Sequence, residues 1–226
     1  MLRSPRSEPL TVPWDVNLMT DAATDRSPSR VSLTEWLRVR LKPLIEGVSR
    51  VLIRLGIGPN LLTLVGLLLS GAAAYFAARG EYVRAGVVFA VGASFDALDG
   101  TVARLAGKAS RFGALFDSTL DRYGEALILS GLAYHMAVQG QVVGVMLAFA
   151  TLFGSVMVSY VRARSEGLGV ENKVGLLTRV ERVALLVLAL LTRQATIGLW
   201  VLAILTHVTV IQRVVHLYRA TRDDRK

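Results

Sequence analysis

Residues 60–78 read NLLTLVGLLLSGAAAYFAA, an apolar run that contains no charged side chain. A soluble domain would scatter its apolar residues at helical or strand periods, whereas an unbroken run close to the roughly 20 residues that cross a bilayer is typical of a membrane span. Pro59 stands directly before the run, at a position where proline commonly opens a helix. The stretch therefore predicts a transmembrane helix that begins near residue 60.

The apolar pattern repeats along the rest of the chain and is preceded by a different kind of helix. We predict six spans, at about 60–78, 82–106, 112–138, 141–165, 179–193 and 196–218. The fifth is short for a bilayer, which leaves open a start nearer Val174. Over residues 32–55 the leucines form one stripe and the arginines lie mostly elsewhere, a pattern typical of a helix on the membrane surface. The predicted fold is all-α: a polytopic membrane protein with six transmembrane helices preceded by an amphipathic surface helix.

The two ends of the chain differ from this membrane domain, which we expect to cover residues 31–220. Residues 1–30 are rich in Ser, Pro, Asp and Arg, show no apolar period and lack the hydrophobic core of a cleavable signal peptide. We expect them to form a disordered cytoplasmic tail, and residues 221–226 to form a short basic tail. The absence of cysteine excludes a disulfide scaffold and thiolate metal sites.

The distribution of basic residues predicts the orientation of the spans. A net charge of +9 could suggest nucleic acid, but basic residues at the ends of apolar spans are explained by the positive-inside rule and by anionic lipids. Alternate connections hold only Arg79, Arg84 and Arg193. The other connections hold many more: Arg104, Lys108, Arg111, Arg162, Arg164, Lys173, Arg179, Arg182 and Arg213. We predict a multi-pass protein of the cell inner (plasma) membrane, with both termini and the active site on the cytoplasmic side. We expect it to contact membrane lipids and not to bind nucleic acid.

Four aspartates lie inside the second and third predicted spans: Asp96, Asp99, Asp117 and Asp121. An ionisable group at membrane depth costs roughly 2.5–3.5 kcal/mol, so four of them require an explanation. Each pair is three or four residues apart and therefore shares one helix face. The turn between the spans is centred near Lys108, at equal distances from Asp99 and Asp117. In an antiparallel hairpin all four carboxylates can therefore meet at one level, about 14–20 Å below the turn.

Converging carboxylates require positive charge among them. Oxygen ligands and high negative charge favour Mg²⁺, Mn²⁺ or Ca²⁺ over Zn²⁺. A pair of such ions could clamp a diphosphate and stabilise both the attacking and the leaving oxygen. Gly100 and Gly113 leave room for a ligand against the backbone. The alternative is that the aspartates only form ion pairs with Arg104, Arg111 and Arg122.

The hairpin also carries a compact motif, DALDGTVAR at 96–104 and GALFDSTLD at 113–121. It resembles the complete signature of the CDP-alcohol phosphotransferase family, D-x2-D-G-x2-A-R-x8-G-x3-D-x3-D. The segment PNLLT at 59–63 resembles the family's P-N-x-x-T, and the resemblance covers roughly residues 35–218. It implies an enzyme of phospholipid biosynthesis that transfers a phosphatidyl-type group from a CDP-lipid, CDP-diacylglycerol, to a small alcohol and releases CMP.

The resemblance also implies a role for each residue of the motif. Two divalent ions, Mg²⁺ or Mn²⁺, would be bound by Asp96, Asp99, Asp117 and Asp121. Asp121 would also act as the catalytic general base that removes the proton of the alcohol. The CDP-lipid would be bound by Asn60, Thr63, Gly100, Ala103, Arg104 and Gly113. The family further implies a homodimer.

Three arginines from three different predicted spans suit a phosphate group on the acceptor: Arg162, Arg182 and Arg213. A guanidinium binds phosphate through parallel hydrogen bonds. The arrangement is similar to the bacterial phosphatidylinositol phosphate synthases, although the first position is usually lysine there and TRVER at 178–182 departs from their ERPER. This implies a phosphorylated polyol, inositol phosphate, as acceptor, with glycerol 3-phosphate as the alternative. Ordinary topology arginines, with Arg162 paired to Glu166, are the other interpretation.

Two other classes of membrane protein also place acidic residues at membrane depth. Prenyltransferases of the aromatic type bind Mg²⁺ through aspartate pairs, but these are spread over more of the chain. A cation or proton transporter carries acidic residues on several spans at different depths, often in repeats. The compact hairpin argues against both, and release of CMP from a CDP-lipid would distinguish the transferase from either.

Overall fold

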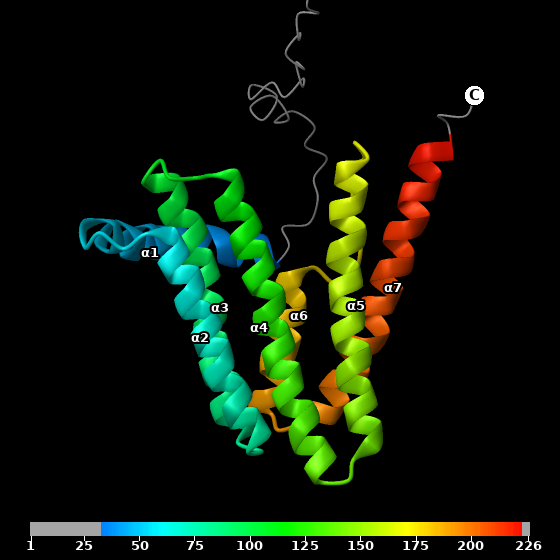
Figure 1. Cartoon of the computed structure of the whole chain (residues 1–226). Coiled ribbons are helices and arrows are strands. Elements are labelled where there is room, and N and C mark those ends of the chain that lie inside the picture. The colour runs from blue at the N-terminus through cyan, green and yellow to red at the C-terminus, as the bar shows by residue number, and fades with distance from the viewer. Residues whose placement is uncertain (1–32, 223–226) are drawn as a thin grey trace, which may run out of the picture. The chain divides into compact units, whose positions relative to one another are not determined.

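The computed structural model describes residues 33–222, and this part of the chain is helical with no strand. The helices are α1 (Leu33–Arg54), α2 (Pro59–Ala78), α3 (Tyr82–Leu105), α4 (Arg111–Val138), α5 (Val142–Gly167), α6 (Arg179–Leu191) and α7 (Ala195–Arg222) (Figure 1). The predicted tail at 1–30 and most of the basic tail at 221–226 lie outside the described residues. The all-α prediction is therefore confirmed for residues 33–222.

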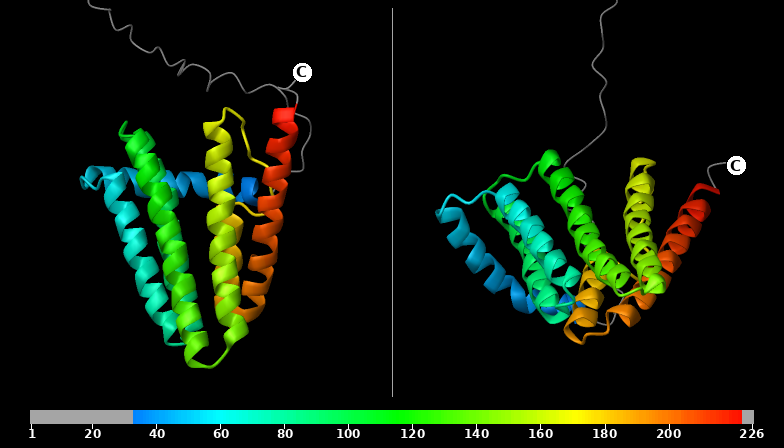
Figure 2. Two further views of the ribbon diagram at one scale, coloured as in Figure 1. Left: turned by 45° about the vertical axis from the view of Figure 1, so that its right-hand side comes forward. Right: turned by 60° about the horizontal axis from the view of Figure 1, so that its bottom comes forward.

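The chain divides into a short N-terminal unit, Met1–Leu41, and a main unit, Lys42–Lys226, which contains α2 to α7. In the main unit the helices run alternately up and down, so that the short turns before α3, α5 and α7 lie at one end of the bundle (Figures 1 and 2). Helix α2 packs against α3 and α4, and α5 packs against α7. Two sets of contacts join these groups: α4 packs against α5, and α6 packs against both α3 and α7.

Small residues allow the helices to approach closely. A Cβ on Gly131 of α4 would lie 2.3 Å from the carbonyl oxygen of Ala74 in α2, and a Cβ on Gly154 of α5 would lie 2.2 Å from Oγ1 of Thr206 in α7. Neither position has room for a larger side chain. Close approach at small residues is the usual way in which helices associate where lipid removes the hydrophobic driving force.

Within residues 33–222, four helices are long and apolar enough to cross a membrane: α2, α3, α5 and α7. Each of the six predicted spans coincides with a helix, and the ends differ from the prediction by at most four residues. Helix α4 has 28 residues but carries the charged side chains of the motif, and α6 has only 13 residues. The membrane nature of the chain is thus supported by four helices, while the crossing of α4 and α6 remains a prediction.

Helix α6 is short because the segment before it enters the bundle as a loop. The start near Val174 that the sequence left open does not occur, and the helix begins at Arg179 after a capping box formed by Thr178 and Glu181. Non-helical backbone at this level needs hydrogen-bond partners inside the protein. Helix α7 supplies them: Thr209 Oγ1 accepts from the backbone N–H of Leu177 at 3.2 Å.

Arg213 of α7 holds the same loop from the other side. Its Nε donates to the carbonyl oxygen of Val174 at 2.9 Å, and its Nη1 donates to the carbonyl oxygen of Val158 in α5 at 2.7 Å. Asn172, which is fully buried, donates to the carbonyl oxygen of Arg213 at 3.0 Å. The loop is therefore fixed between α5 and α7, and it delivers the first residues of α6 to the middle of the bundle (Figure 1).

The turn between α3 and α4 sets the depth of the aspartates. Gly107 has φ 63°, a left-handed conformation that glycine adopts without steric cost, and it reverses the chain after α3. Ser110 then caps α4 by accepting a hydrogen bond from the backbone N–H of Gly113 at 2.9 Å. The five-residue connection between Leu105 and Arg111 brings the second half of α3 and the first half of α4 to the same end of the bundle, where both helices pack against α2.

Candidate metal and substrate site

Three of the four aspartates converge. One carboxylate oxygen from each of Asp96, Asp99 and Asp117 lies within 4.8 Å of the other two. Asp96 and Asp99 come from α3 and Asp117 comes from α4, as the equal distances from the turn predict. No other cluster of this kind occurs among the residues that the structure describes.

The partners of these three carboxylates differ. Oδ2 of the buried Asp99 accepts a hydrogen bond from the hydroxyl of Thr63 in α2 at 2.7 Å. Oδ1 of Asp117 is buried and has no hydrogen-bond partner among the described residues. A buried carboxylate oxygen without a partner is costly, so this atom calls for a ligand from outside the protein.

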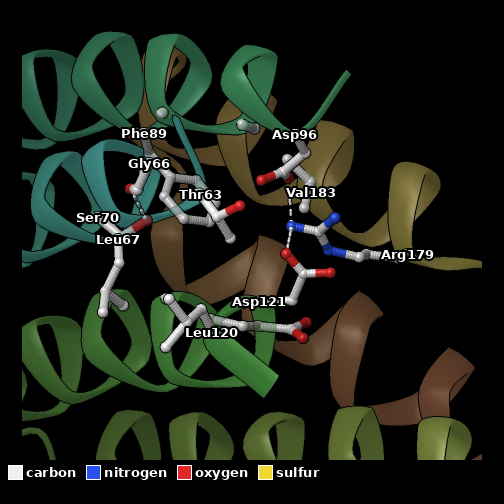
Figure 3. Close-up of a pocket in the computed structure, with 14 residues that line it drawn as sticks. Thr63, Gly66, Leu67, Ser70, Phe89, Asp96, Leu120, Asp121, Arg179 and Val183 are labelled. Atoms are coloured by element: carbon white, nitrogen blue, oxygen red, sulfur yellow. Dashed lines mark hydrogen bonds and ion pairs between the residues drawn. The ribbon is translucent and has the colours of Figure 1, made fainter. Parts of the chain in front are cut away.

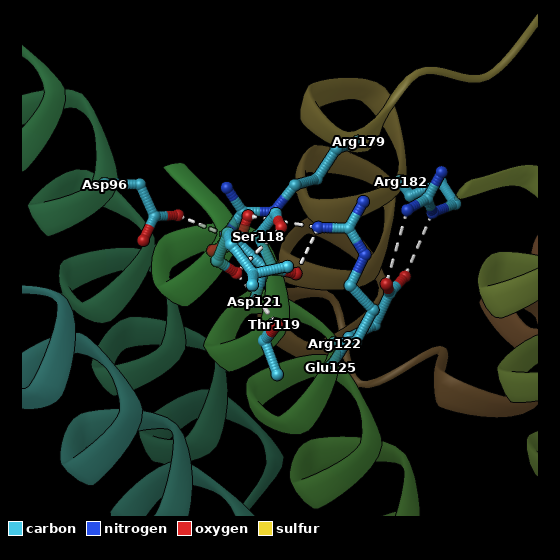
Figure 4. Close-up of polar contacts among 9 residues, drawn as sticks. Asp96, Ser118, Thr119, Asp121, Arg122, Glu125, Arg179 and Arg182 are labelled. Carbon is cyan, nitrogen blue, oxygen red and sulfur yellow. Dashed lines mark hydrogen bonds and ion pairs between the residues drawn. The ribbon is translucent and has the colours of Figure 1, made fainter. Parts of the chain in front are cut away.

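Arg179, the first residue of α6, links Asp121 to Asp96. Its Nη2 donates to Oδ2 of Asp96 and forms an ion pair with Oδ1 of Asp121 at 2.6 Å (Figures 3 and 4). Arg122 approaches Asp121 more loosely, with 3.7 Å between Nη1 and Oδ2. The sequence offered Arg104, Arg111 and Arg122 as ion-pair partners for the aspartates. In the described structure only Arg122 forms such a pair, and Arg104 donates to Thr101 instead.

The donor set fits a divalent metal ion. It consists of carboxylate oxygens, which are the ligands of Mg²⁺ and Mn²⁺, and the described chain offers no thiolate. The unpartnered Oδ1 of Asp117 and the mutual spacing of the three carboxylates match a site that a cation completes. Asp96, Asp99 and Asp117 can therefore hold such an ion, and Asp121 stands next to it across Arg179.

A cavity of about 210 Å³ opens on one side of the aspartates. Its lining includes Asp99 and Asp117 and all six residues that the resemblance implies for the CDP-lipid: Asn60, Thr63, Gly100, Ala103, Arg104 and Gly113. Lys108 and Ser110 of the turn also line it, which the motif did not indicate. The cavity is open at one side and carries two basic side chains, Arg104 and Lys108, as a diphosphate requires.

A second, smaller cavity of about 20 Å³ is lined by the other two aspartates, Asp96 and Asp121 (Figure 3). Asp96, Asp121, Glu125 and Arg179 provide its charged lining, and the small and apolar residues of α2 and α3 close its far wall. A space of this size accommodates about one water molecule. The two cavities share Thr63, and the aspartates are divided between them in two pairs.

The three arginines predicted for the acceptor are near one another but already have protein partners. Arg182 of α6 is buried and forms two parallel hydrogen bonds to Glu125 of α4, at 3.0 Å and 3.3 Å (Figure 4). Arg162 is exposed and pairs with Glu166 at 2.8 Å, as the alternative interpretation expected. Arg213 is bound to two carbonyl oxygens, and the charges of Arg162 and Arg182 lie within electrostatic range of it.

Two residues of the site were missed by reasoning from the sequence. Arg179 was assigned to topology, because the TRVER segment offered two arginines and only its last matched the comparison that we used. Glu125 was not considered at all, although it lies four residues after Asp121 in the same helix. That spacing was an available signal, since a further acidic residue on the same face of a membrane helix rarely lacks a partner.

Comparisons with known proteins agree with this geometry. The family model for CDP-alcohol phosphatidyltransferase matches residues 57–214. The chain belongs to the CDP-alcohol phosphatidyltransferase family. It is thus a transferase of phospholipid biosynthesis, and the matched residues include both cavities and all of the aspartates.

Members of the family with related sequences include synthases from archaea and bacteria. The archaetidylinositol phosphate synthase of Pyrococcus horikoshii is 41% identical over 179 residues, which cover 79% of this chain and 93% of that protein. The phosphatidylinositol phosphate synthase of Streptomyces avermitilis is 33% identical over 165 residues, covering 71% and 67% of the two chains. The chain is therefore similar to transferases that act with two different lipid types.

A solved structure of the family superimposes well on the chain. The phosphatidylinositol phosphate synthase of Mycobacterium tuberculosis with CDP-DAG bound is 27% identical and has a TM-score of 0.72, with 78% of this chain and 94% of that chain covered. The same enzyme has been solved in complex with manganese and citrate, also with a TM-score of 0.72. The helical arrangement described above is thus that of a CDP-alcohol phosphatidyltransferase.

Proposed function

We propose that the protein is a metal-dependent synthase that transfers a phosphatidyl-type group from CDP-diacylglycerol to a phosphorylated polyol, inositol phosphate, and releases CMP. The observation that carries this proposal is the convergence of Asp96, Asp99 and Asp117 beside a cavity lined by every residue expected for the CDP-lipid. The solved relatives with CDP-DAG and with manganese support the same assignment.

The residues of the site have separate roles in this reaction. Asp96, Asp99, Asp117 and Asp121 form the site of two Mg²⁺ or Mn²⁺ ions, which supply positive charge to the diphosphate when they are bound. Thr63 keeps the Asp99 carboxylate turned toward the site. The glycines of the motif leave the backbone of α3 and α4 accessible to the CDP-lipid, while Arg104 lines the cavity as a cation.

Asp121 acts as the general base. Its side chain is only 7% exposed and lines the smaller cavity, whereas the CDP-lipid cavity is lined by Asp99 and Asp117. The acceptor hydroxyl gives its proton to Asp121 while its oxygen attacks the phosphorus, and the bond from phosphorus to CMP breaks.

Arg162, Arg182 and Arg213 bind the phosphate of the acceptor in this proposal. Nη1 of Arg182 and Nη2 of Arg213 make no hydrogen bond to any residue in the described part of the chain, so each guanidinium keeps one group for a ligand. Glu125 fixes the orientation of Arg182. A dianionic phosphate needs several such donors, each contributing roughly 1.5–3 kcal/mol.

The names of the relatives support inositol phosphate over glycerol 3-phosphate. The relative from Pyrococcus is an archaetidylinositol phosphate synthase, and those from Streptomyces and Mycobacterium are phosphatidylinositol phosphate synthases. Glycerol 3-phosphate carries the same phosphate on a smaller body and is the alternative acceptor. The archaeal relative is named for an archaeal lipid, so a CDP-linked archaeal lipid is the alternative donor to CDP-diacylglycerol.

The placement of the protein in the membrane is part of the same proposal. Six helices cross the inner (plasma) membrane, an amphipathic helix at 32–55 lies on its surface, and a membrane domain at 31–220 lies between a cytoplasmic tail and a basic tail. Both termini and the active site face the cytoplasm, and two copies form a homodimer. The basic residues around the Asp-rich end of the bundle and the water-soluble acceptor support this orientation.

The test is CMP release by the purified full chain with Mn²⁺ or Mg²⁺. CDP-diacylglycerol and a CDP-linked archaeal lipid are each offered with inositol phosphate, glycerol 3-phosphate, inositol and serine in turn. We expect release with inositol phosphate to exceed release with every other acceptor. Faster release with serine or free inositol would contradict a phosphate site formed by arginines, and no release with any pair would contradict the transferase assignment.

A further inference from the structure

Arg179 joins three helices at the centre of the site. It is the first residue of α6, and its Nη2 contacts Asp96 of α3 and Asp121 of α4 (Figure 4). Its guanidinium is therefore the principal cation beside the four aspartates in the described structure. Arg122 makes only one longer contact, to Asp121.

The carboxylate of Asp96 belongs to two arrangements. It contributes an oxygen to the group of three that fits a metal ion, and it also accepts a hydrogen bond from Arg179. Asp99 and Asp117, in contrast, form no hydrogen bond or ion pair with Arg179 in the described structure, and Oδ1 of Asp117 is without a partner there. The arginine thus binds the two aspartates that line the smaller cavity.

The guanidinium of Arg179 and a divalent ion compete for the same carboxylate and repel each other. Buried carboxylates without a counter-charge are strongly unfavourable, so in the absence of metal the guanidinium stabilises the site. Once an ion binds, it competes with the arginine for Asp96, and the two cations repel each other within a few ångströms. Coupling of this kind is reciprocal: the bound ion weakens the contact of the arginine by the same factor by which the arginine weakens the binding of the ion.

The side chain of Arg179 is able to leave. It is 34% exposed, whereas that of Arg182, one turn further along α6, is 3% exposed and locked by two hydrogen bonds to Glu125. Arg182 is thus a fixed cation. Arg179 is bound only through the two aspartates.

We propose that Arg179 is the resident counter-ion of the metal-free site and that it leaves Asp96 and Asp121 when divalent ions bind. The inference rests on the proposed function, because it requires a metal at the aspartates. Departure of Arg179 breaks its ion pair with Oδ1 of Asp121, so that metal binding removes this cation from the carboxylate that lines the smaller cavity.

The first test is the affinity of the full-length protein for Mn²⁺ without substrates, measured from the electron paramagnetic resonance signal of free Mn²⁺. Arg179→Gln removes the competing charge and should bind Mn²⁺ about tenfold more tightly than the wild type. Arg179→Lys keeps a cation and should remain close to the wild type. The matched control is Arg84→Gln, whose arginine is 72% exposed and pairs with Glu81 at the opposite end of α3, and its affinity should not change.

The second test uses the wild-type protein and does not depend on the folding of a variant. Phenylglyoxal modifies accessible arginines, and mass spectrometry measures the rate at each one. We expect Mn²⁺ to accelerate modification of Arg179 and to leave that of Arg84 unchanged. An unchanged or slower rate at Arg179, or an Arg179→Gln affinity equal to or below that of the wild type, would overturn the inference. Failure of the wild type to bind Mn²⁺ would instead overturn the proposed function.

Discussion

The two charged regions of the molecule, the aspartates of α3 and α4 and the arginines of α5, α6 and α7, are built in different ways. The aspartates lie within 26 consecutive residues, and one short turn brings them together. The arginines come from three helices, and two of them depend on partners elsewhere in the chain: Arg182 on Glu125, and Arg213 on the carbonyl oxygens of Val158 and Val174. The carboxylate region is thus a local structure, while the arginine region exists only in the assembled bundle.

This difference predicts different consequences of mutation. The aspartates have few protein partners, and Oδ1 of Asp117 has none among the described residues, so their substitution should affect chemistry more than folding. The arginines hold loops and helices as well as any ligand, so their substitution should affect acceptor binding and stability together.

The largest effect is expected for Asp117→Asn. The change keeps the shape of the side chain but removes a charge worth several kcal/mol to a metal-assisted transition state, so CMP release should fall by about three powers of ten or more. Glu171→Gln, a change of the same kind at an exposed carboxylate that pairs with Lys173, is the control and should retain full activity. Near-normal turnover of Asp117→Asn at saturating Mn²⁺ would contradict the shared metal site.

A smaller effect is expected for Arg182→Gln, which tests the arginine region. Acceptor binding should weaken by about one to two powers of ten, at roughly 1.4 kcal/mol for each, while the KM for the CDP-lipid changes little. Initial rates at varied acceptor and varied CDP-lipid separate the two effects. Equal losses for both substrates would mean that the residue supports the fold and does not recognise the acceptor.

Glu125→Gln should have an effect of the same kind but smaller. The glutamine keeps one hydrogen bond to Arg182 and loses the charge, so the KM for the acceptor should rise about threefold to tenfold. If Glu125 acts only by orienting Arg182, the double variant with Arg182→Gln should be no worse than Arg182→Gln alone. Additive losses in this cycle would show that Glu125 acts independently of the arginine.

The smallest effect is expected for Thr63→Val, an isosteric change that removes the hydroxyl bonded to Asp99. Loss of one hydrogen bond of about 1 kcal/mol should weaken Mn²⁺ binding by about fivefold, as measured by calorimetric titration in detergent. Thr119→Val, at an exposed threonine of α4 that bonds only to the carbonyl of Leu115, is the matched control. Equal affinities of Thr63→Val and the wild type would mean that Thr63 does not orient the metal ligand.

The carboxylate region could be predicted from the sequence because its geometry depends on local rules. Helical periodicity and equal distances from the turn placed Asp96, Asp99 and Asp117 together, and the structure brings these three within reach of one ion. The same rules placed the helix ends within a few residues, since the ends of the apolar runs and Pro59 mark them in the chain. Asp121 was expected at the same level, but its partner comes from α6, about 58 residues away, and no local pattern encodes that contact.

The arginine region could be predicted only in part for the same reason. The sequence suggested that Arg162, Arg182 and Arg213 lie near one level. In agreement, the charges of Arg162 and Arg182 both act on Arg213. It did not indicate that Arg213 binds two backbone carbonyls, because the loop that provides one of them has no periodic pattern. The short α6 and the inserted loop before it are likewise tertiary features, fixed by Thr209, Asn172 and Arg213.

The most direct test of the account is a structure of the full-length protein grown with Mn²⁺, with the anomalous scattering of manganese recorded. The account predicts manganese between the carboxylates of Asp96, Asp99 and Asp117, with Arg179 no longer bonded to Asp121. Manganese bound only elsewhere, or an empty site in which Arg179 still bridges Asp96 and Asp121 at saturating Mn²⁺, would contradict it.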